Sequence, residues 1–172
     1  MRDESCTFYG KYRGIVSSNK DPLMMGRIRA RVPDALGDQE SGWAMPCALF
    51  GGSKMGFFAL PDEGAGVWIE FEHGDLDYPL WSGCWWGSMV DMPSEMIVPP
   101  LMASKKVMIK TSGGSSVLID DTPGLGGITL KTSTGQKIVM NSLGITIEYC
   151  MGRSIKLEST GVSINDGALE VI

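Results

Sequence analysis

The chain has 172 residues, a formal net charge of −5 at pH 7 and 23 glycines. That length suits one domain or two small ones, and the acidic balance argues against nucleic acid or an anionic membrane as the main partner, because both favour clustered lysine and arginine. No stretch has sustained helical periodicity, a signal-peptide core or the length of a membrane span. The sequence therefore predicts an all-β protein made in a cytoplasm.

A small barrel is expected at residues 10–87, after an N-terminal extension at residues 1–9. Two stretches alternate apolar with polar or charged residues, which is typical of strands with one buried face. Their inward-facing residues are Ile28, Ala30 and Val32 in the first stretch and Val67, Ile69 and Phe71 in the second. Three more strands fit near residues 12–16, 43–50 and 80–86, which gives the five strands of an OB-type barrel.

Residues 88–104 are expected to form an extended connector. The segment is rich in methionine, contains Pro93, Pro99 and Pro100, and lacks alternation. Prolines at that density suit an extended connector better than a strand or a helix.

Residues 105–172 predict a ladder of very short strands joined by tight turns. Pairs of apolar residues with one residue between them recur there, and their starting positions advance by 10, 7, 10, 7 and 7. The pairs are Ile128/Leu130, Ile138/Met140, Ile145/Ile147, Ile155/Leu157, Val162/Ile164 and Leu169/Val171. Glycines separate the pairs, and a fixed period of this kind indicates stacked, equivalent units. Residues 117–119 begin the ladder irregularly, and a loop at 120–127 interrupts it.

The apolar face of this ladder needs a cover, because a strand with one apolar face must bury that face against something. The segment contains no helix and no second sheet of a different pattern. Three identical chains around a common axis would supply the cover, so the twelve residues of the six pairs are predicted to form the core of an intertwined trimeric β-helix. Single-chain solenoids fit less well, because hexapeptide helices need three similar sides per coil and calcium-binding β-rolls need glycine-aspartate nonapeptides.

Two stretches of the barrel segment are recognisable as family motifs. They are residues 21–32, DPLMMGRIRARV, and residues 60–83, LPDEGAGVWIEFEHGDLDYPLWSG. Both resemble the central spike of contractile phage tails, which is related to phage baseplate assembly protein V and to VgrG of type VI secretion. The resemblance implies an OB barrel joined to a trimeric C-terminal β-helix. It also implies a homotrimeric spike that is seated on baseplate hub proteins below the tail tube and pierces the target cell envelope on contraction.

Three departures from that family shape the expected partners. The connector leaves no room for a lysozyme domain, the only histidine, His73, lies far from a metal-binding tip, and only nine residues precede the barrel. We therefore expect a separate hub polypeptide, contacted by residues 1–9, and a PAAR-type tip protein over the apolar last turn at 168–172. The expected location is the tail baseplate of a virion, or a phage-like injection particle, with synthesis in the bacterial cytoplasm.

No catalytic, cofactor-binding or metal-binding residues are expected. Carboxylates that could suggest a glycosidase pair fall in turns or on an outward strand face, where they are solvated. They are Asp62, Glu63, Glu70, Glu72, Asp75 and Asp77. Cys6, Cys47, Cys84 and Cys150 are widely spaced without a CxxC pair, which favours reduced, buried thiols over zinc. A disulfide between two of the first three, or between subunits, is the alternative.

Two other functions compete with the spike. In a nucleic-acid-binding OB-fold protein with a trimerising β tail, Trp81, Trp85 and Trp86 would stack bases, although an aromatic core or a subunit contact fits the acidic chain better. A peptidoglycan-degrading enzyme is the third possibility. The basic stripe of Arg27, Arg29 and Arg31 is expected to be solvated, or to pair with acidic groups of the hub or with Glu70 and Glu72.

Overall fold

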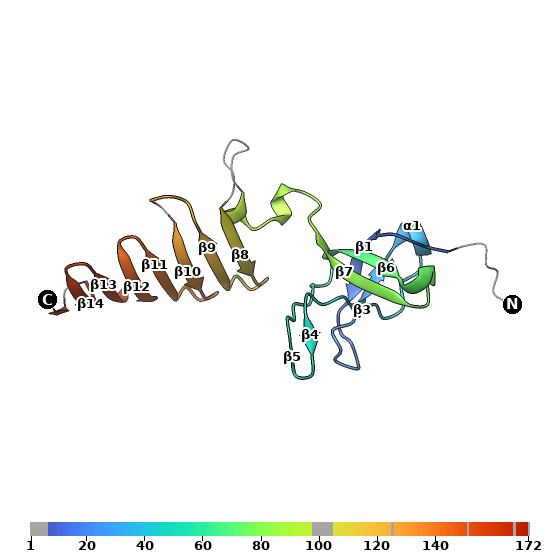
Figure 1. Ribbon diagram of the computed structural model, residues 1–172, viewed down its shortest axis with the longest axis horizontal. Coiled ribbons are helices and arrows are strands. Elements are labelled where there is room, and N and C mark those ends of the chain that lie inside the picture. Colours follow the sequence, from blue (N-terminus) through green and yellow to red (C-terminus); the bar gives the residue numbers. More distant parts are fainter. Residues whose placement is uncertain (1–6, 98–104, 125, 151, 167, 172) are drawn as a thin grey trace. The chain divides into compact units, whose positions relative to one another are not determined.

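The computed structural model describes residues 7–97, 105–124, 126–150, 152–166 and 168–171, without the side chains of residues 170 and 171. The chain divides into two compact units, Met1–Asp91 and Met92–Ile172. Strands dominate both units, which confirms the prediction of an all-β protein (Figure 1). Where the chain is described, none of its helices combines the length and apolar character that crossing a bilayer requires.

The first unit is a barrel built on a five-stranded sheet of order β2-β1-β6-β7-β3 (Figure 1). Its strands are β1 (Tyr12–Ser18), β2 (Arg29–Arg31), β3 (Met45–Pro46), β6 (Gly66–Phe71) and β7 (Pro79–Trp85). The two edges of the sheet meet at Ile28 and Ala44, where the Ala44 N–H donates to the Ile28 carbonyl at 2.8 Å and the Ile28 N–H donates to the Ala44 carbonyl at 3.2 Å. The sheet is thereby closed, as predicted for an OB-type barrel.

The core of the barrel consists of the side chains that the alternation predicted to face inward, joined by two more. The buried apolar residues are Val16, Ile28, Ala30, Val32, Ala44, Val67, Ile69 and Phe71. They come from β1, from β6 and from the segments in and around β2 and β3, and they pack into one cluster. Burial of their apolar surface is the main force that holds this unit together.

Smaller elements differ in detail from the sequence prediction. The strand expected at 43–50 shortens to β3, although the Cys47 N–H still donates to the Trp81 carbonyl of β7 at 2.9 Å. The glycine turn at 51–54 belongs to a hairpin of β4 (Gly51–Gly52) and β5 (Met55–Gly56). Local turn chemistry adds two short helices, α1 (Pro33–Leu36) and η1 (Glu72–Gly74), and α1 begins with the proline that a first helical turn tolerates.

Phe8 belongs to the barrel, although the sequence placed it in the N-terminal extension. Its N–H donates to the Gly74 carbonyl at 3.0 Å. Its ring lies 6.2 Å from that of Tyr12 and 6.4 Å from that of Phe71, measured between centroids. The first six residues of the expected extension lie outside the described part of the chain.

The segment expected as an extended connector contains two single turns of 3-10 helix, η2 (Met89–Asp91) and η3 (Ser94–Met96). Pro93 directly precedes η3, and its carbonyl accepts the Met96 N–H at 2.9 Å. A proline is compatible with the start of a helical turn because the first N–H groups have no partner inside the turn. Residues 98–104 lie outside the described part.

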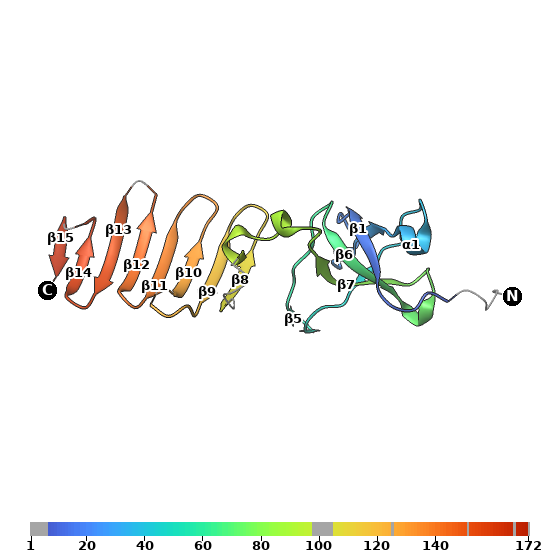
Figure 2. The same cartoon turned by 90° about the horizontal axis from the view of Figure 1, so that it is seen from above.

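The second unit is one eight-stranded sheet whose strands follow each other in chain order (Figure 2). They are β8 (Lys106–Lys110), β9 (Ser116–Asp120), β10 (Gly127–Lys131), β11 (Lys137–Asn141), β12 (Gly144–Tyr149), β13 (Arg153–Glu158), β14 (Gly161–Ile164) and β15 (Leu169–Val171). All neighbours are antiparallel. The predicted ladder of short strands is found, and within one chain it forms a sheet and not a helix, because each strand pairs with its neighbours in sequence.

Candidate subunit interface

One face of the second sheet carries two continuous rows of apolar side chains. Strand register aligns the first row as Val107, Ile119, Ile128, Met140, Ile145, Leu157 and Val162, and the second as Ile109, Val117, Leu130, Ile138, Ile147, Ile155, Ile164 and Leu169. Residues two apart in a strand point to the same side, so both rows share one face. The backbone of Val171 pairs with Val162 at the end of the first row, but its side chain is outside the described part.

This apolar face is uncovered in a single chain. Most side chains of the two rows are between 37% exposed, at Ile128 and Ile145, and 64% exposed, at Val107. The remaining members are half-buried. Ile28 and Ile69 in the barrel are, by contrast, fully buried. An apolar surface of this extent indicates a binding partner, because it would otherwise remain in contact with water.

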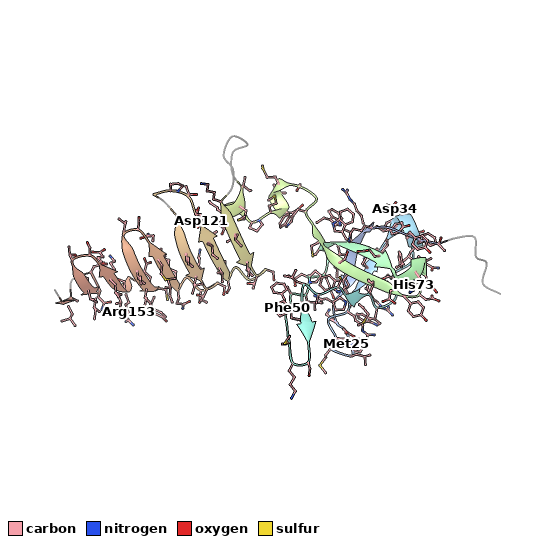
Figure 3. All side chains as sticks on the ribbon, in the orientation of Figure 1. Met25, Asp34, Phe50, His73, Asp121 and Arg153 are labelled. Atoms are coloured by element: carbon pink, nitrogen blue, oxygen red, sulfur yellow. The ribbon has the colours of Figure 1, made fainter. Side chains whose placement is uncertain are left out.

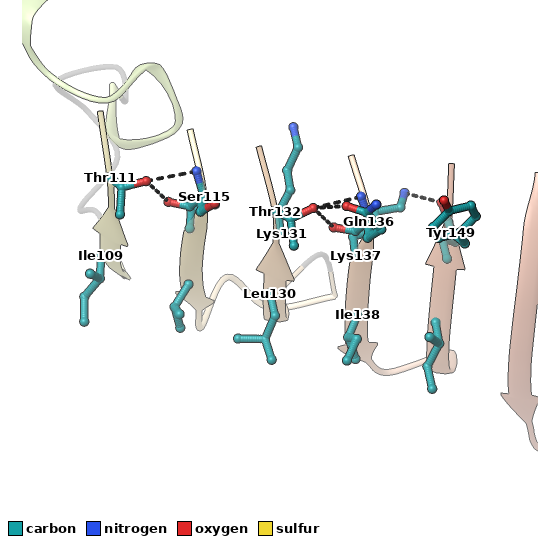
Figure 4. A pocket seen from close by; sticks show the side chains of 14 residues that line it. Ile109, Thr111, Ser115, Leu130, Lys131, Thr132, Gln136, Lys137, Ile138 and Tyr149 are labelled. Carbon is teal, nitrogen blue, oxygen red and sulfur yellow. Dashed lines mark hydrogen bonds and ion pairs between the residues drawn. The ribbon is translucent and has the colours of Figure 1, made fainter. Parts of the chain in front are cut away.

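A groove of about 540 Å³ lies over the second row between β8 and β12 (Figure 4). Its floor includes Ile109, Leu130 and Ile138. Its rim is polar and ordered, since the Ser115 N–H donates to Thr111 Oγ1 at 3.2 Å and the Gln136 N–H donates to Thr132 Oγ1 at 3.1 Å. The same strands thus offer an apolar centre with a polar rim, which is the usual composition of a protein interface.

The opposite face of the sheet carries charged residues, although its central row also includes Met108, Leu118 and Val139. Lys137 pairs with Glu148 across β11 and β12 at 3.0 Å. Lys110 pairs with Glu95 of η3 at 2.7 Å, and this ammonium lowers the pKa of the Glu95 carboxyl. Partly exposed ion pairs of this kind contribute about 0–1 kcal/mol each. Charged groups tolerate water, so this face is better suited to solvent than the face with the two apolar rows.

All twelve residues that the sequence singled out occupy backbone positions in the two rows, and their role as a trimer core stays a prediction. Four more members were not among the twelve: Val107 and Ile109, and also Val117 and Ile119, which the sequence placed at the irregular start of the ladder. Their strands show the same spacing of two, but the residues between them, Met108 and Leu118, are also apolar. The alternation that would have identified these strands is therefore hidden.

Of the three arginines expected to form a basic stripe, Arg27 and Arg29 have partners within the barrel, and Arg31 is exposed. The Arg27 guanidinium pairs with Asp21 at 2.6 Å and lies 5.6 Å from the centre of the Trp43 ring. Arg29 lies 5.2 Å from the same ring. The expected pairing with Glu70 and Glu72 is wrong.

Glu70 instead bonds to Lys11 at 2.5 Å, and this ammonium lowers the pKa of the Glu70 carboxyl. The strand ends before Glu72, which lies in η1. The outward face that the sequence assigned to both carboxylates therefore holds for Glu70 alone.

Two of the three candidate base-stacking tryptophans are tied to the barrel backbone. Trp81 Nε1 donates to the Gly26 carbonyl at 3.1 Å, and Trp85 Nε1 donates to the Val67 carbonyl at 3.1 Å. The Arg13 guanidinium lies 5.1 Å from the Trp85 ring centre. Trp86 is exposed. These contacts suit the structural role that the sequence favoured.

Other candidate groups are placed as follows. His73 lies in η1 with φ 53°, in the turn that the sequence predicted (Figure 3). In the described ranges, no group of three or more His, Cys, Asp or Glu side chains could hold a metal ion.

Cys47 and Cys84 are free but exposed, so the prediction of burial is wrong for both, because they lie on the outer side of the barrel. Cys150 is free and partly buried.

Comparison with known families gives two matches that together cover most of the chain. Residues 12–86 match the type VI secretion system/phage-baseplate injector OB domain. Residues 106–170 match the phage baseplate V C-terminal trimerisation domain. Individual curated proteins give no match. The closed barrel and the uncovered apolar sheet fit these two domains in the same order, and the chain belongs to the phage baseplate V family as a homotrimeric baseplate component.

Proposed function

We propose that this protein is the central spike of a contractile tail baseplate, a trimeric needle that sits below the tail tube and pierces the target cell envelope on contraction. The observation that carries this proposal is the pair of apolar rows, in register across the second sheet and uncovered in one chain. Three such sheets around an axis would bury their rows against one another. They would turn their charged faces to water, which is the arrangement of a soluble, rigid shaft.

The hub contact is proposed for the barrel unit, including the N-terminal extension. Two adjoining loops there present apolar side chains to solvent, among them Met24, which is 90% exposed, and Phe58. Phe50 is exposed as well (Figure 3). The loops adjoin at Gly26, where an added Cβ would lie 2.8 Å from the Phe58 ring. An exposed apolar patch of this kind suits a permanent protein contact.

The tip contact is proposed for the far end of the sheet. β15 is the edge strand there, and a protein of the PAAR type would cover the apolar rows at that end. No catalytic step is part of the proposal. Purified protein is expected to leave cell-wall substrate intact in zymography, and clearing of that substrate would indicate a hydrolase.

The oligomeric core is tested by a matched pair of substitutions in β12. Ile147→Asp places a carboxylate in the second apolar row, whereas Thr146→Asp places the same group on the opposite face, one residue away. Native mass spectrometry of the full chain should give a trimer for the parent and for Thr146→Asp. It should give mainly monomer for Ile147→Asp, because a charge buried without a partner is strongly destabilising.

A monomeric parent under native conditions and in unheated SDS would contradict the proposal. The piercing role needs a separate measurement. Tail particles assembled with Ile147→Asp should bind target cells without permeabilising their envelope, and full permeabilisation by such particles would refute a mechanical role for the spike.

A further inference from the structure

Strand β12 differs from its neighbours at both ends of the apolar face. Its alternation extends the two central isoleucines outward to Leu143 at one end and Tyr149 at the other. Leu143, in the turn before the strand, is 79% exposed, and Tyr149 is 52% exposed. β12 and the turn before it therefore carry four apolar residues at every second position, Leu143, Ile145, Ile147 and Tyr149.

In the other strands the corresponding flanking positions are polar or glycine. They are Lys105 and Thr111 for β8, Ser115 and Asp121 for β9, Gly126 and Thr132 for β10, Gln136 and Ser142 for β11, Arg153 and Ser159 for β13, and Thr160 and Asp166 for β14. Side chains at the strand ends are reached by water in any assembly that buries only the two central rows. A leucine and a tyrosine at opposite ends of one strand therefore need a separate explanation.

The ends of the strands form two long sides of the sheet, and neighbouring chains of a trimer meet along these sides. Leu143 lies at the same ends of the strands as Asp121, and Tyr149 lies at the same ends as Arg153. These two sides of the sheet are opposite (Figure 3). In a cyclic trimer every interface is heterologous, so one of these two sides of a chain faces the other side of the next chain. Because the three chains run in the same direction along the axis, equal strands lie at equal heights.

We propose that Leu143 of each chain packs against Tyr149 of the next, so that three identical apolar contacts close the seams of the trimer at the level of β12. This inference rests on the proposed trimeric spike and names the residues that meet at its seams. The contact cannot form within one chain. Leu143 and Tyr149 are six residues apart along an extended strand, a separation of about 20 Å.

Cysteine cross-linking tests the contact in the full-length chain. In a background with the four native cysteines replaced by serine, Leu143→Cys and Tyr149→Cys are introduced together and the protein is mildly oxidised. A disulfide requires Cα atoms about 4.4–6.8 Å apart. We expect a covalent trimer in heated, non-reducing SDS and loss of the monomer band, whereas each single variant should stay monomeric in the same gel.

A displaced pair is the matched control. Leu143→Cys with Thr132→Cys joins the same edge residue to a position two strands away, about 10 Å along the stack at the usual spacing of strands. Stronger cross-linking of this control than of the Leu143/Tyr149 pair would overturn the contact at equal height.

Native mass spectrometry of the same double variant separates the two proposals. A trimer without cross-links refutes the seam contact and leaves the spike in place, whereas a monomeric parent refutes the spike.

A charge exchange provides a second readout that needs no oxidation. Leu143→Glu alone should lower the thermal stability of the trimer, and adding Tyr149→Lys should restore it, whereas Ser142→Glu with Tyr149→Lys should show no restoration. Equal behaviour of the two double variants would also overturn the contact.

Discussion

At the residue scale, the Asp21 carboxylate is buried and is held by hydrogen bonds and by an ion pair. Its side chain is 3% exposed and that of Arg27 is 16% exposed. Its carboxylate accepts the Leu23 N–H at 2.9 Å and the Met25 N–H at 2.8 Å, in addition to the ion pair with Arg27. The Arg27 guanidinium, helped by these N–H groups, holds the pKa of the Asp21 carboxyl well below its usual range. This residue therefore fixes the loop that presents Met24 to solvent.

Asp21→Asn should lower the thermal stability of the barrel at pH 7. A carboxyl whose pKa is lowered by folding stabilises the protein fully above its ordinary pKa of about 3.9, and this contribution is lost as the pH falls through the folded value. The difference in melting temperature between parent and variant should therefore shrink between pH 7 and pH 2.5. All 5 tryptophans lie in the barrel unit, so their fluorescence reports on it alone. An equal difference at both pH values would contradict this account, and Asp34→Asn, in the exposed helix α1, is the control.

At the element scale, glycine recurs where β10 and β12 begin. Gly127 and Gly144 have φ values of 159° and 148°. A Cβ on Gly144 would lie 2.0 Å from the Leu157 carbonyl oxygen of the adjacent strand, and one on Gly127 would lie 2.2 Å from the Met140 carbonyl oxygen. The repeat of the sequence thus reflects close backbone approach at the strand starts as well as the burial of apolar pairs.

Gly144→Ala should destabilise the second sheet by more than about 1 kcal/mol, because alanine fits neither the backbone conformation nor the space. Denaturant unfolding followed by circular dichroism provides the measurement. Gly113→Ala, where the nearest atom to an added Cβ is Thr111 Oγ1 at 4.0 Å, should change stability little. Similar losses for both variants would show that the close approach at Gly144 has no energetic weight.

What the sequence could predict depended on whether one periodicity dominated a segment. Ile28, Val67 and their neighbours alternate cleanly, so the main barrel strands and most of the ladder followed from the pattern alone. Met108 and Leu118 interrupt the alternation of β8 and β9, so the apolar pairs of both strands were left out of the predicted core, although residues 117–119 were placed at the start of the ladder. The Asp21–Arg27 pair could not be predicted, because it depends on a folded loop and not on periodicity.

At the scale of the whole molecule, the two units obtain their apolar cores in different ways. The fully buried apolar side chains of the described residues all belong to the barrel, whereas the rows of the second sheet are uncovered in one chain, and we propose that other copies cover them. Stability that depends on association rises with protein concentration, and stability within one chain does not. The family match to a trimerisation domain covers the unit for which this dependence is expected.

Thermal unfolding should therefore show two transitions with different concentration dependence. The transition reported by tryptophan fluorescence should keep its midpoint temperature when the protein is diluted about a hundredfold. The transition of the second sheet, followed by circular dichroism, should shift to lower temperature on dilution. A shared midpoint at all concentrations would show that the two units unfold as one.

The strictly sequential order of β8 to β15 has a mechanical consequence (Figure 2). Hydrogen bonds between neighbouring strands point along the direction in which the strands are stacked. A push in that direction presses each strand onto the next and loads the whole stack together. A pull in the same direction opens one hairpin at a time from the end, as a zipper opens. A shaft of three such sheets, as proposed above, would resist thrust far better than traction, which suits a single forward stroke.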